Sequence, residues 1–361
     1  MRIKTIATAA LVTATALAFA GCASNETPAA GGTTAAGESK TLTGVGASSQ
    51  KSAQEKWVAE FQTKNSNITV NYSPDGSGAG RSAFIAGAAN FAGSDRPFKD
   101  EEMGAGKFAS CAADSNALNL PVYISPIAVI FQVDGVTELS LEPATVAGIF
   151  SGKITKWNDP AIAKTNPDAK LPDAAITAVH RADDSGTTNN FTDTLNKTAA
   201  DVWTEAASDT FPAAFGGEAA NGTAGVVQAV TGGKNTIGYS DASAAGKLSK
   251  ASLLVGGKPL QPTADAAATI LDASKTIAGR EANDLAYSLD RTSDGVYPAV
   301  LVSYAIVCQT YKDAAVGTLV KDYVTYITSA AGQTSAATAA GSAPLSSALQ
   351  AKVKTAIDSV K

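Results

Sequence analysis

Residues 181–191, RADDSGTTNNF, gather a cation, two carboxylates and several hydroxyl groups within a few positions. Arg181 carries a fixed positive charge, and the hydroxyls of Ser185 and Thr187 donate hydrogen bonds. Such a segment can hold a small, highly charged anion, although a solvated loop can have the same composition. The segment alone leaves both interpretations open.

Two more segments, 43–51 (TGVGASSQK) and 72–84 (YSPDGSGAGRSAF), are rich in glycine and serine and precede predicted helices, the second of which we expect to begin near Arg81. A helix N-terminus offers unpaired N–H groups, and glycine lets an anion approach the backbone. Serine or threonine before a helix is usually only an N-cap. Three such junctions, one with an arginine, favour an anion site over capping alone. The candidate hydroxyl donors in the three segments are Ser48, Ser49, Ser77, Ser185 and Thr187.

Asp95 lies in the segment 90–98, NFAGSDRPF. It is either a turn aspartate beside a solvated Arg96 or a carboxylate inside the anion site. A buried carboxylate accepts a hydrogen bond from an oxyanion that still carries a proton, such as hydrogen phosphate, and repels fully ionised sulfate. Discrimination of this kind can reach about 10⁴–10⁵-fold, because a buried group is otherwise left unpaired.

The sequence matches known enzyme and metal-binding motifs poorly. The glycines at 76–80 form neither a dinucleotide fingerprint nor a nucleotide phosphate loop. Ser48 and Lys51 have the Ser-x-x-Lys spacing of penicillin-binding enzymes, without their other elements. His180 is the only histidine, no Gly-x-Ser-x-Gly or Cys-x-x-Cys occurs, and we expect neither a hydrolase, a metal site nor a cofactor.

Alternating strands and helices must position these residues, which indicates an α/β fold. The 328–343 stretch, rich in small residues, is expected to be a loop with a helix end. Helices are predicted at 52–64, 187–196 and 346–357, and strands at 68–72, 121–133, 175–180 and 300–311.

The N-terminus has the pattern of an export signal over residues 1–21, with Arg2 and Lys4 before an apolar run. Cys22 follows in LAFAGC and resembles the lipidated cysteine of a bacterial lipobox; an ordinary secretory peptide is the alternative. Residues 22–40 hold no bulky apolar side chain, which predicts a flexible tether. We expect the folded part to work outside the cytoplasmic membrane, anchored by Cys22.

Without Arg2 and Lys4, 26 basic residues face 33 acidic ones, a net charge of −7. This balance argues against nucleic-acid binding, and it means that an anion site must work by local hydrogen bonds. The chain has three cysteines, and setting aside the lipid candidate Cys22 leaves Cys111 and Cys308. In an exported protein they favour a disulfide over two buried thiols.

The order of several motifs resembles one family, the extracytoplasmic phosphate-binding protein of the high-affinity phosphate ABC importer. The resemblance runs from about Leu42 to the C-terminus, and two motifs, SGKITKW and RADDSGT, are together specific. The matching motifs are TGVGAS, GSGAG, FAGSD, SGKITKWNDPAIAKTNP, RADDSGTT and TIGYSDA.

This resemblance implies a type II periplasmic-binding-protein fold, with two hinged domains and phosphate in the cleft between them. We expect domain I at 41–128 plus 299–361 and domain II at 129–298, with chain crossings within about 121–132 and 292–302. It also implies a monomer whose partners are phosphate and a membrane permease.

The family's site residues carry over by motif. Asp95 matches the proton acceptor, and Asp183 matches an aspartate that holds Arg181 in place. The matched phosphate donors are Ser48, Ser49, Ser77, Arg181, Ser185, Gly186 and Thr187. Ser49 stands where the family often has phenylalanine and contacts the ligand through its backbone N–H; His180 and Asp184 replace a frequent arginine and glycine.

The sequence therefore predicts a lipid-anchored phosphate receptor without enzymatic activity. The alternatives are a receptor for another oxyanion such as sulfate, a serine hydrolase or phosphatase using Ser48, and an adhesive lipoprotein without a ligand.

Overall fold

The computed structural model describes residues 40–361, which lie in one compact unit. The predicted signal peptide, Cys22 and nearly all of the predicted tether lie outside the described residues. The first element, β1 (Lys40–Gly46), begins at the last residue assigned to that tether. Among residues 40–361, no helix is both long and apolar enough to cross a membrane.

One continuous mixed sheet organises the described chain, with β4 (Ala117–Gln132) near its middle. The N-terminal part of β4 pairs with β13 (Val300–Cys308), and Pro126 there faces Val300. From Ile127 onward β4 pairs with β8 (Thr236–Asp241). The partners of β4 thus change inside the predicted crossing segment 121–132. The strand order is β2 (Ile68–Ser73), β1, β3 (Phe91–Ser94), β13, β4, β8, β6 (Thr177–Arg181), β7 (Glu218–Ala220).

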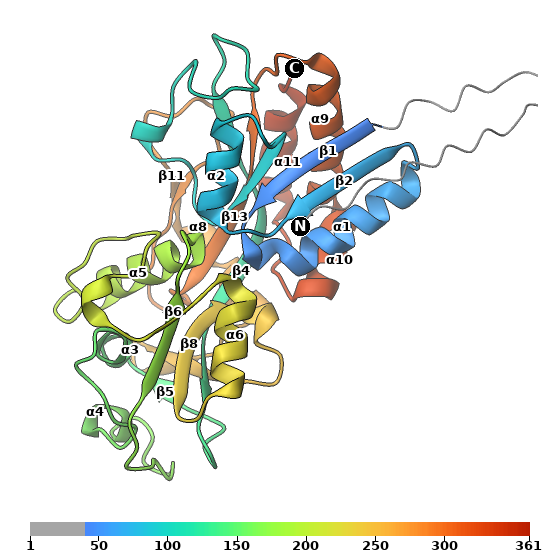
Figure 1. Ribbon diagram of the computed structural model, residues 1–361. Coiled ribbons are helices and arrows are strands. Elements are labelled where there is room, and N and C mark those ends of the chain that lie inside the picture. The colour runs from blue at the N-terminus through green and yellow to red at the C-terminus, as the bar shows by residue number, and fades with distance from the viewer. Residues whose placement is uncertain (1–39) are drawn as a thin grey trace, which may run out of the picture. The chain divides into compact units, whose positions relative to one another are not determined.

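Figure 1 shows helices from both ends of the chain around β1, β2 and β13, and helices from the middle of the chain around β6 and β8. The first group comprises α1 (Lys51–Lys64), α2 (Ser77–Ile85), α9 (Ala314–Thr328), α10 (Ala330–Ala340) and α11 (Ser347–Asp358). The second comprises α3 (Pro143–Phe150), α4 (Pro160–Ala163), α5 (Gly186–Thr198) and α6 (Gly222–Gly232). The division of the chain into two domains, with its boundaries, remains a prediction.

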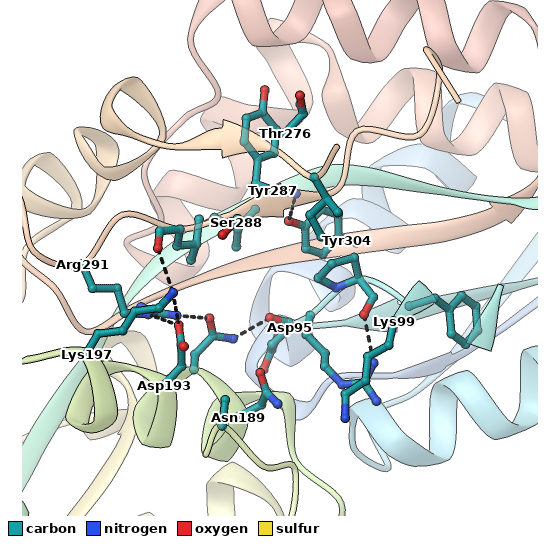
Figure 2. A pocket seen from close by; sticks show the side chains of 18 of the residues that line it. Asp95, Lys99, Asn189, Asp193, Lys197, Thr276, Tyr287, Ser288, Arg291 and Tyr304 are labelled. Carbon is teal, nitrogen blue, oxygen red and sulfur yellow. Dashed lines mark hydrogen bonds and ion pairs between the residues drawn. The ribbon is translucent and has the colours of Figure 1, made fainter. Parts of the chain in front are cut away.

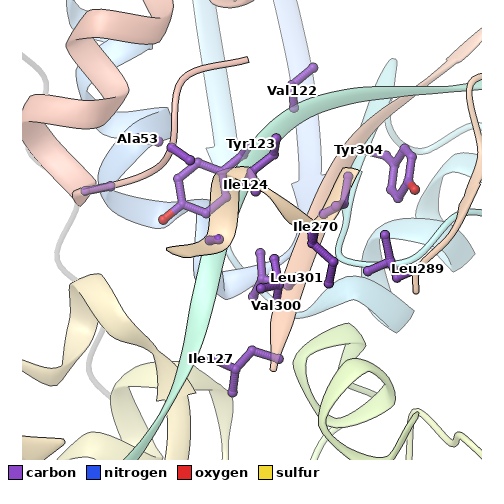
Figure 3. Packing of buried hydrophobic residues seen from close by; sticks show 14 of the residues in the cluster. Ala53, Val122, Tyr123, Ile124, Ile127, Ile270, Leu289, Val300, Leu301 and Tyr304 are labelled. Carbon is purple, nitrogen blue, oxygen red and sulfur yellow. The ribbon is translucent and has the colours of Figure 1, made fainter. Parts of the chain in front are cut away.

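The central strands are hydrophobic along their whole length because helices and loops cover both of their faces. Every residue of β13 and nearly every residue of β4 is buried. In Figure 3, Tyr123, Ile124 and Ile127 of β4 lie near Val300 and Leu301 of β13, with Ile270 and Leu289 nearby. A packed strand pair at the middle of the sheet is a rigid support for the side chains at its edges.

Most predicted elements are confirmed within a few residues, including the apolar stripe Leu349, Val353 and Ile357, which is buried. Two predictions are wrong. Residues 330–340 form the full helix α10, capped by the Ser329 hydroxyl and ended by Gly341 in the left-handed conformation, because alanine is a strong helix former. The second helix begins at Ser77, not near Arg81, because Gly76 supplies the turn before it with a φ of 106°.

The predicted disulfide is present. Cys111 and Cys308 are bonded with their Cα atoms 5.3 Å apart, across 197 residues of sequence. Cys308 ends β13, and Cys111 lies in the long connection between β3 and β4, so the bond ties this connection to the central strand.

Candidate anion-binding site

Asp95 directly follows β3 and is only 2% exposed. Its Oδ1 accepts hydrogen bonds from the Ser49 hydroxyl at 2.6 Å and the Ser303 hydroxyl at 2.7 Å. Its Oδ2 accepts from the Thr187 hydroxyl at 2.9 Å. Three hydroxyl donors from distant parts of the sequence therefore converge on one buried carboxylate.

The Gly/Ser-rich junctions that the sequence singled out meet around this carboxylate. The backbone N–H of Asp95 donates to the Ser77 hydroxyl at 3.1 Å. Gly186 opens α5 beside them, where an added Cβ would lie 2.6 Å from the Ser77 Oγ. The structure thus brings together Ser49, Ser77, Asp95, Gly186 and Thr187, with the N-termini of α2 and α5 at the same place.

The glycines of the segment 76–80 are explained by close backbone approach. An added Cβ would lie 2.6 Å from the Asp183 Oδ2 at Gly76, 2.3 Å from the Asp184 Cβ at Gly78 and 2.6 Å from the Gly46 Cα at Gly80. The Gly78 N–H also donates to the Asp184 carbonyl at 3.0 Å. Only glycine lets α2 lie this close both to β1 and to the loop after β6.

Arg181 ends β6 and is 3% exposed. Its Nε donates to the Asp183 Oδ1 at 2.7 Å, and its Nη2 also bonds and ion-pairs with the Asp183 carboxylate. Burial raises the pKa of Asp183, but the hydrogen bonds and charge of Arg181 and the Gly222 N–H outweigh it and hold that pKa below its ordinary value. Asp183 therefore fixes the guanidinium through one edge, and Nη1 takes no part in the pair.

Two of the predicted donors use their hydroxyls for helix capping in this structure. The Ser185 side chain caps α5 by accepting from the Thr188 N–H at 3.1 Å. The Ser48 hydroxyl accepts from the Thr223 N–H at 3.1 Å and bonds the Thr223 hydroxyl at 3.0 Å. Ser48 thus contacts the first turn of α6, an element far from Ser48 in the sequence.

His180 and Asp184, which depart from the family pattern, have polar and aromatic contacts with residues other than Asp95. The His180 ring stacks on Phe211 at 4.2 Å, and its Nδ1 lies 3.0 Å from the Arg181 carbonyl. These contacts give the histidine a structural role. Asp184 is exposed and accepts from the Thr210 hydroxyl at 3.0 Å.

Two separate cavities border the cluster. One, of about 500 Å³, is lined by Asp95 and by residues of α5, β13 and the β11–β12 hairpin (Lys275–Thr276 and Tyr287–Ser288). Figure 2 shows Asp95, Asn189, Asp193 and Arg291 around it. The other, of about 430 Å³, is lined by Ser48, Ser49 and residues of α6. Within the described chain, no group of three His, Cys, Asp or Glu side chains is placed to hold a metal ion.

Comparison with known proteins identifies the family. Residues 28–331 match the PBP superfamily domain. The chain is 34% identical to phosphate-binding protein PstS 3 of Mycobacterium tuberculosis, over 97% of both chains. It is 36% identical to the PstS 3 protein of Mycobacterium leprae, over 90% of both chains. The chain belongs to the PstS family of phosphate-binding proteins.

The fold is also found in solved structures. The structure matches a phosphate-binding protein from Stenotrophomonas maltophilia with a TM-score of 0.69 and 21% identity, over 88% of this chain and 93% of the other. PstS membership confirms the predicted family and its non-enzymatic character. The mixed α/β architecture confirms the predicted fold class.

Two residues in contact with Asp95 were missed by sequence reasoning. Ser303 is the one serine within the apolar strand β13, a signal that was available. Asn190 follows the Ser-Gly-Thr-Thr run, and its side-chain amide donates to the Asp95 carbonyl at 2.5 Å and to the Gly186 carbonyl at 2.9 Å. It thereby joins the start of α5 to the loop after β3.

Proposed function

We propose that this chain binds inorganic phosphate at the cluster around Asp95 and delivers it to a membrane ABC permease. The observation that carries the proposal is the buried carboxylate surrounded by hydroxyl donors and two helix N-termini. Donors alone suit any oxyanion, whereas a buried acceptor suits one that still carries a proton. The names of the PstS relatives point to the same ligand.

The proposed phosphate ligands are the carried-over set. Arg181, oriented by Asp183, supplies the charge, and its Nη1 takes no part in that pair and can donate to an anion. The N–H groups at the starts of α2 and α5 add donors and the positive ends of helix dipoles. On binding, the backbone N–H of Ser49 would donate to phosphate, while the hydroxyls of Ser49 and Thr187 keep donating to Asp95.

Closure between the two predicted domains would exclude water and strengthen each of these contacts. The ion pairs around Asp209 support this part of the proposal. The Asp209 carboxylate pairs with Arg81 of α2 at 2.7 Å and with Arg96, after β3, at 2.7 Å. Asp209 belongs to the predicted domain II and both arginines to domain I, so these pairs would form on closure.

A hydrolase using Ser48 is disfavoured by the contacts of this serine. Its hydroxyl bonds Thr223, and Lys51 lies 3.9 Å from Glu55 on the exposed face of α1. We further propose that the protein acts outside the cytoplasmic membrane, held there by lipid on Cys22. Substitution Cys22→Ser would then release the protein from the membrane fraction.

Equilibrium dialysis of the full-length chain with labelled phosphate tests the ligand. Arg181→Ala is expected to weaken binding by about tenfold or more, because a charge-assisted contact is lost. Lys156→Ala removes a cation from an exposed ion pair and serves as the control. Delivery is tested by measuring phosphate uptake in cells that lack the chain. The wild-type chain should restore uptake, and Arg181→Ala should not. Absence of binding by the folded wild-type chain would refute the proposal.

A further inference from the structure

A line of buried side chains runs from α9 to the Asp95 carboxylate. The Tyr323 hydroxyl donates to the Gln54 Oε1 at 2.7 Å, and the Gln54 Nε2 donates to the Gln50 Oε1 at 2.8 Å. The Gln50 Nε2 donates to the Ser303 hydroxyl at 2.6 Å, and Ser303 donates to the Asp95 Oδ1 at 2.7 Å. We call these four side chains the relay: Tyr323, Gln54, Gln50 and Ser303.

The chemistry of the groups fixes the direction of the relay. The Gln50 Nε2 also lies 3.3 Å from the Tyr304 carbonyl, an oxygen that only accepts, which places the amide nitrogen on that side. The Gln50 Oε1 must then accept from Gln54, and the Gln54 oxygen must accept from Tyr323. Burial raises the pKa of Tyr323 well above its ordinary value, so its hydroxyl keeps the proton that it donates. In each hydrogen bond of the relay, the donor therefore lies farther from Asp95 and the acceptor lies nearer to it.

The relay is isolated from water. Tyr323, Gln50 and Ser303 are fully buried and Gln54 is 1% exposed. Buried polar groups of this kind are retained only where each finds a partner, because an unpaired group costs about 1–3 kcal/mol. A connected network in a low-dielectric interior also holds its members in one arrangement.

The backbone supports the last link. The pairing register between β13 and β4 shifts between Ser303 and Tyr304. Such irregularities re-aim a side chain in an otherwise alternating strand. Ser303 is thereby directed at Asp95 from inside a strand whose other residues are nearly all apolar.

We propose that the relay positions Asp95 and so sets the preference of the site for an oxyanion that carries a proton. The inference rests on the proposed phosphate-binding function and assigns its selectivity to residues remote from the ligand. Ser303 and Ser49 saturate Oδ1, which leaves Oδ2, on the Thr187 side, for the proton of the ligand. Without the hydroxyl of Ser303, Oδ1 loses one of its two donors, so the carboxylate is held less firmly with Oδ2 toward the ligand.

The first arm of the test needs no ligand. Side-chain amide resonances of Gln50 and Gln54 are recorded by NMR in the full-length chain, in Tyr323→Phe and in Tyr311→Phe. Tyr311 is the matched control, since its buried hydroxyl donates to the Asn90 carbonyl at 2.7 Å, outside the relay. The relay predicts that Tyr323→Phe shifts both glutamines, including Gln50 two links away, and that the control shifts neither.

The second arm titrates the same proteins, with Ser303→Ala and Ser303→Thr, with inorganic phosphate and with sulfate. Ser303→Ala is expected to narrow the ratio of sulfate to phosphate Kd by about tenfold, and Tyr323→Phe by about two- to tenfold. Ser303→Thr, which keeps the hydroxyl, retains most of the ratio, and Tyr311→Phe leaves it unchanged.

The outcomes separate the two proposals. If the wild-type chain binds phosphate and the ratio is the same in Ser303→Ala and Tyr323→Phe, the relay has no role in selectivity and this inference is overturned alone. If the folded wild-type chain binds no phosphate, the proposed function fails, and the selectivity role of the relay fails with it.

Discussion

Gly186 packs against Asp95 so closely that an added Cβ at Gly186 would lie 2.7 Å from the Asp95 Cβ. The start of α5 and the loop after β3 meet at this contact, where no side chain fits. The same contact brings the Thr187 hydroxyl to the Asp95 Oδ2 at 2.9 Å. The missing side chain of one residue thus determines how closely the donors of α5 approach the carboxylate.

Gly186→Ala should therefore weaken phosphate binding. Overpacking costs about 1–3 kcal/mol, which corresponds to about 5- to 150-fold in affinity if it falls on the closed form. Gly232→Ala is the control, because an added Cβ at Gly232 has no neighbour within 4 Å. Calorimetric titration measures both; equal affinities in the two variants would contradict the close contact.

Asp183→Asn tests the orientation of Arg181. The amide keeps one acceptor oxygen and loses the charge, so we expect phosphate affinity to fall by about tenfold and the free energy of unfolding by about 1.5–3 kcal/mol. Asp173→Asn, in an exposed pair with Lys156, should change neither. Titration and urea unfolding measure the effects. If Asp183→Asn matches the Asp173→Asn control in both phosphate affinity and free energy of unfolding, Arg181 does not need Asp183 to hold it in place.

Asp241 should make the protein less stable as pH rises. Burial raises its pKa to about 6, against hydrogen bonds from Ser243 and Ser125. Between a pH near the ordinary pKa, about 3.9, and a pH of about 6, Asp241 therefore holds a proton in the folded protein that it has lost in the unfolded chain. This contribution to stability is fully present below the ordinary value and is lost as pH rises through about 6.

Asp241→Asn cannot titrate and should flatten this part of the pH dependence. The measurement is the free energy of unfolding by urea at pH 4 to 7 for the wild type and the variant. Parallel curves for the two proteins would show that the carboxyl of Asp241 is not responsible.

The disulfide between Cys111 and Cys308 closes a loop of 197 residues. Replacing both cysteines with serine should lower the free energy of unfolding by about 2–4 kcal/mol, because the unfolded chain regains freedom. Phosphate affinity should remain, since neither cysteine contacts Asp95 or its donors. Unchanged denaturation midpoints with and without the bond would contradict this expectation.

The fold was predictable where pattern and burial agree. Helix α1 and strand β13 each have a strong pattern of apolar residues in their local sequence, so their positions were predicted to within a few residues. Helix α10 has no such stripe, since alanine, serine, threonine and glycine supply most of it. Its helical state depends on alanine propensity and on packing against α1, which the sequence pattern does not display.

The site was predictable where its residues sit in local motifs. Asp95, Gly186 and Thr187 each lie at a strand end or helix start with a recognisable composition. Ser303 reaches Asp95 across 208 residues of sequence, and only the pairing of β3 with β13 brings the two together. The serine is unusual within an apolar strand, but the carboxylate that it meets follows from tertiary structure alone.

The central claim is tested most directly by titrating the full-length chain and its Asp95→Asn variant with phosphate and then with sulfate. We predict that the wild type binds phosphate much more tightly than sulfate. The variant, which offers an amide donor in place of an acceptor-only oxygen, should bind sulfate or lose phosphate affinity. A wild-type chain that is folded and silent toward phosphate, or a variant with unaltered preference, would contradict the assignment of Asp95 as the acceptor that selects the ligand.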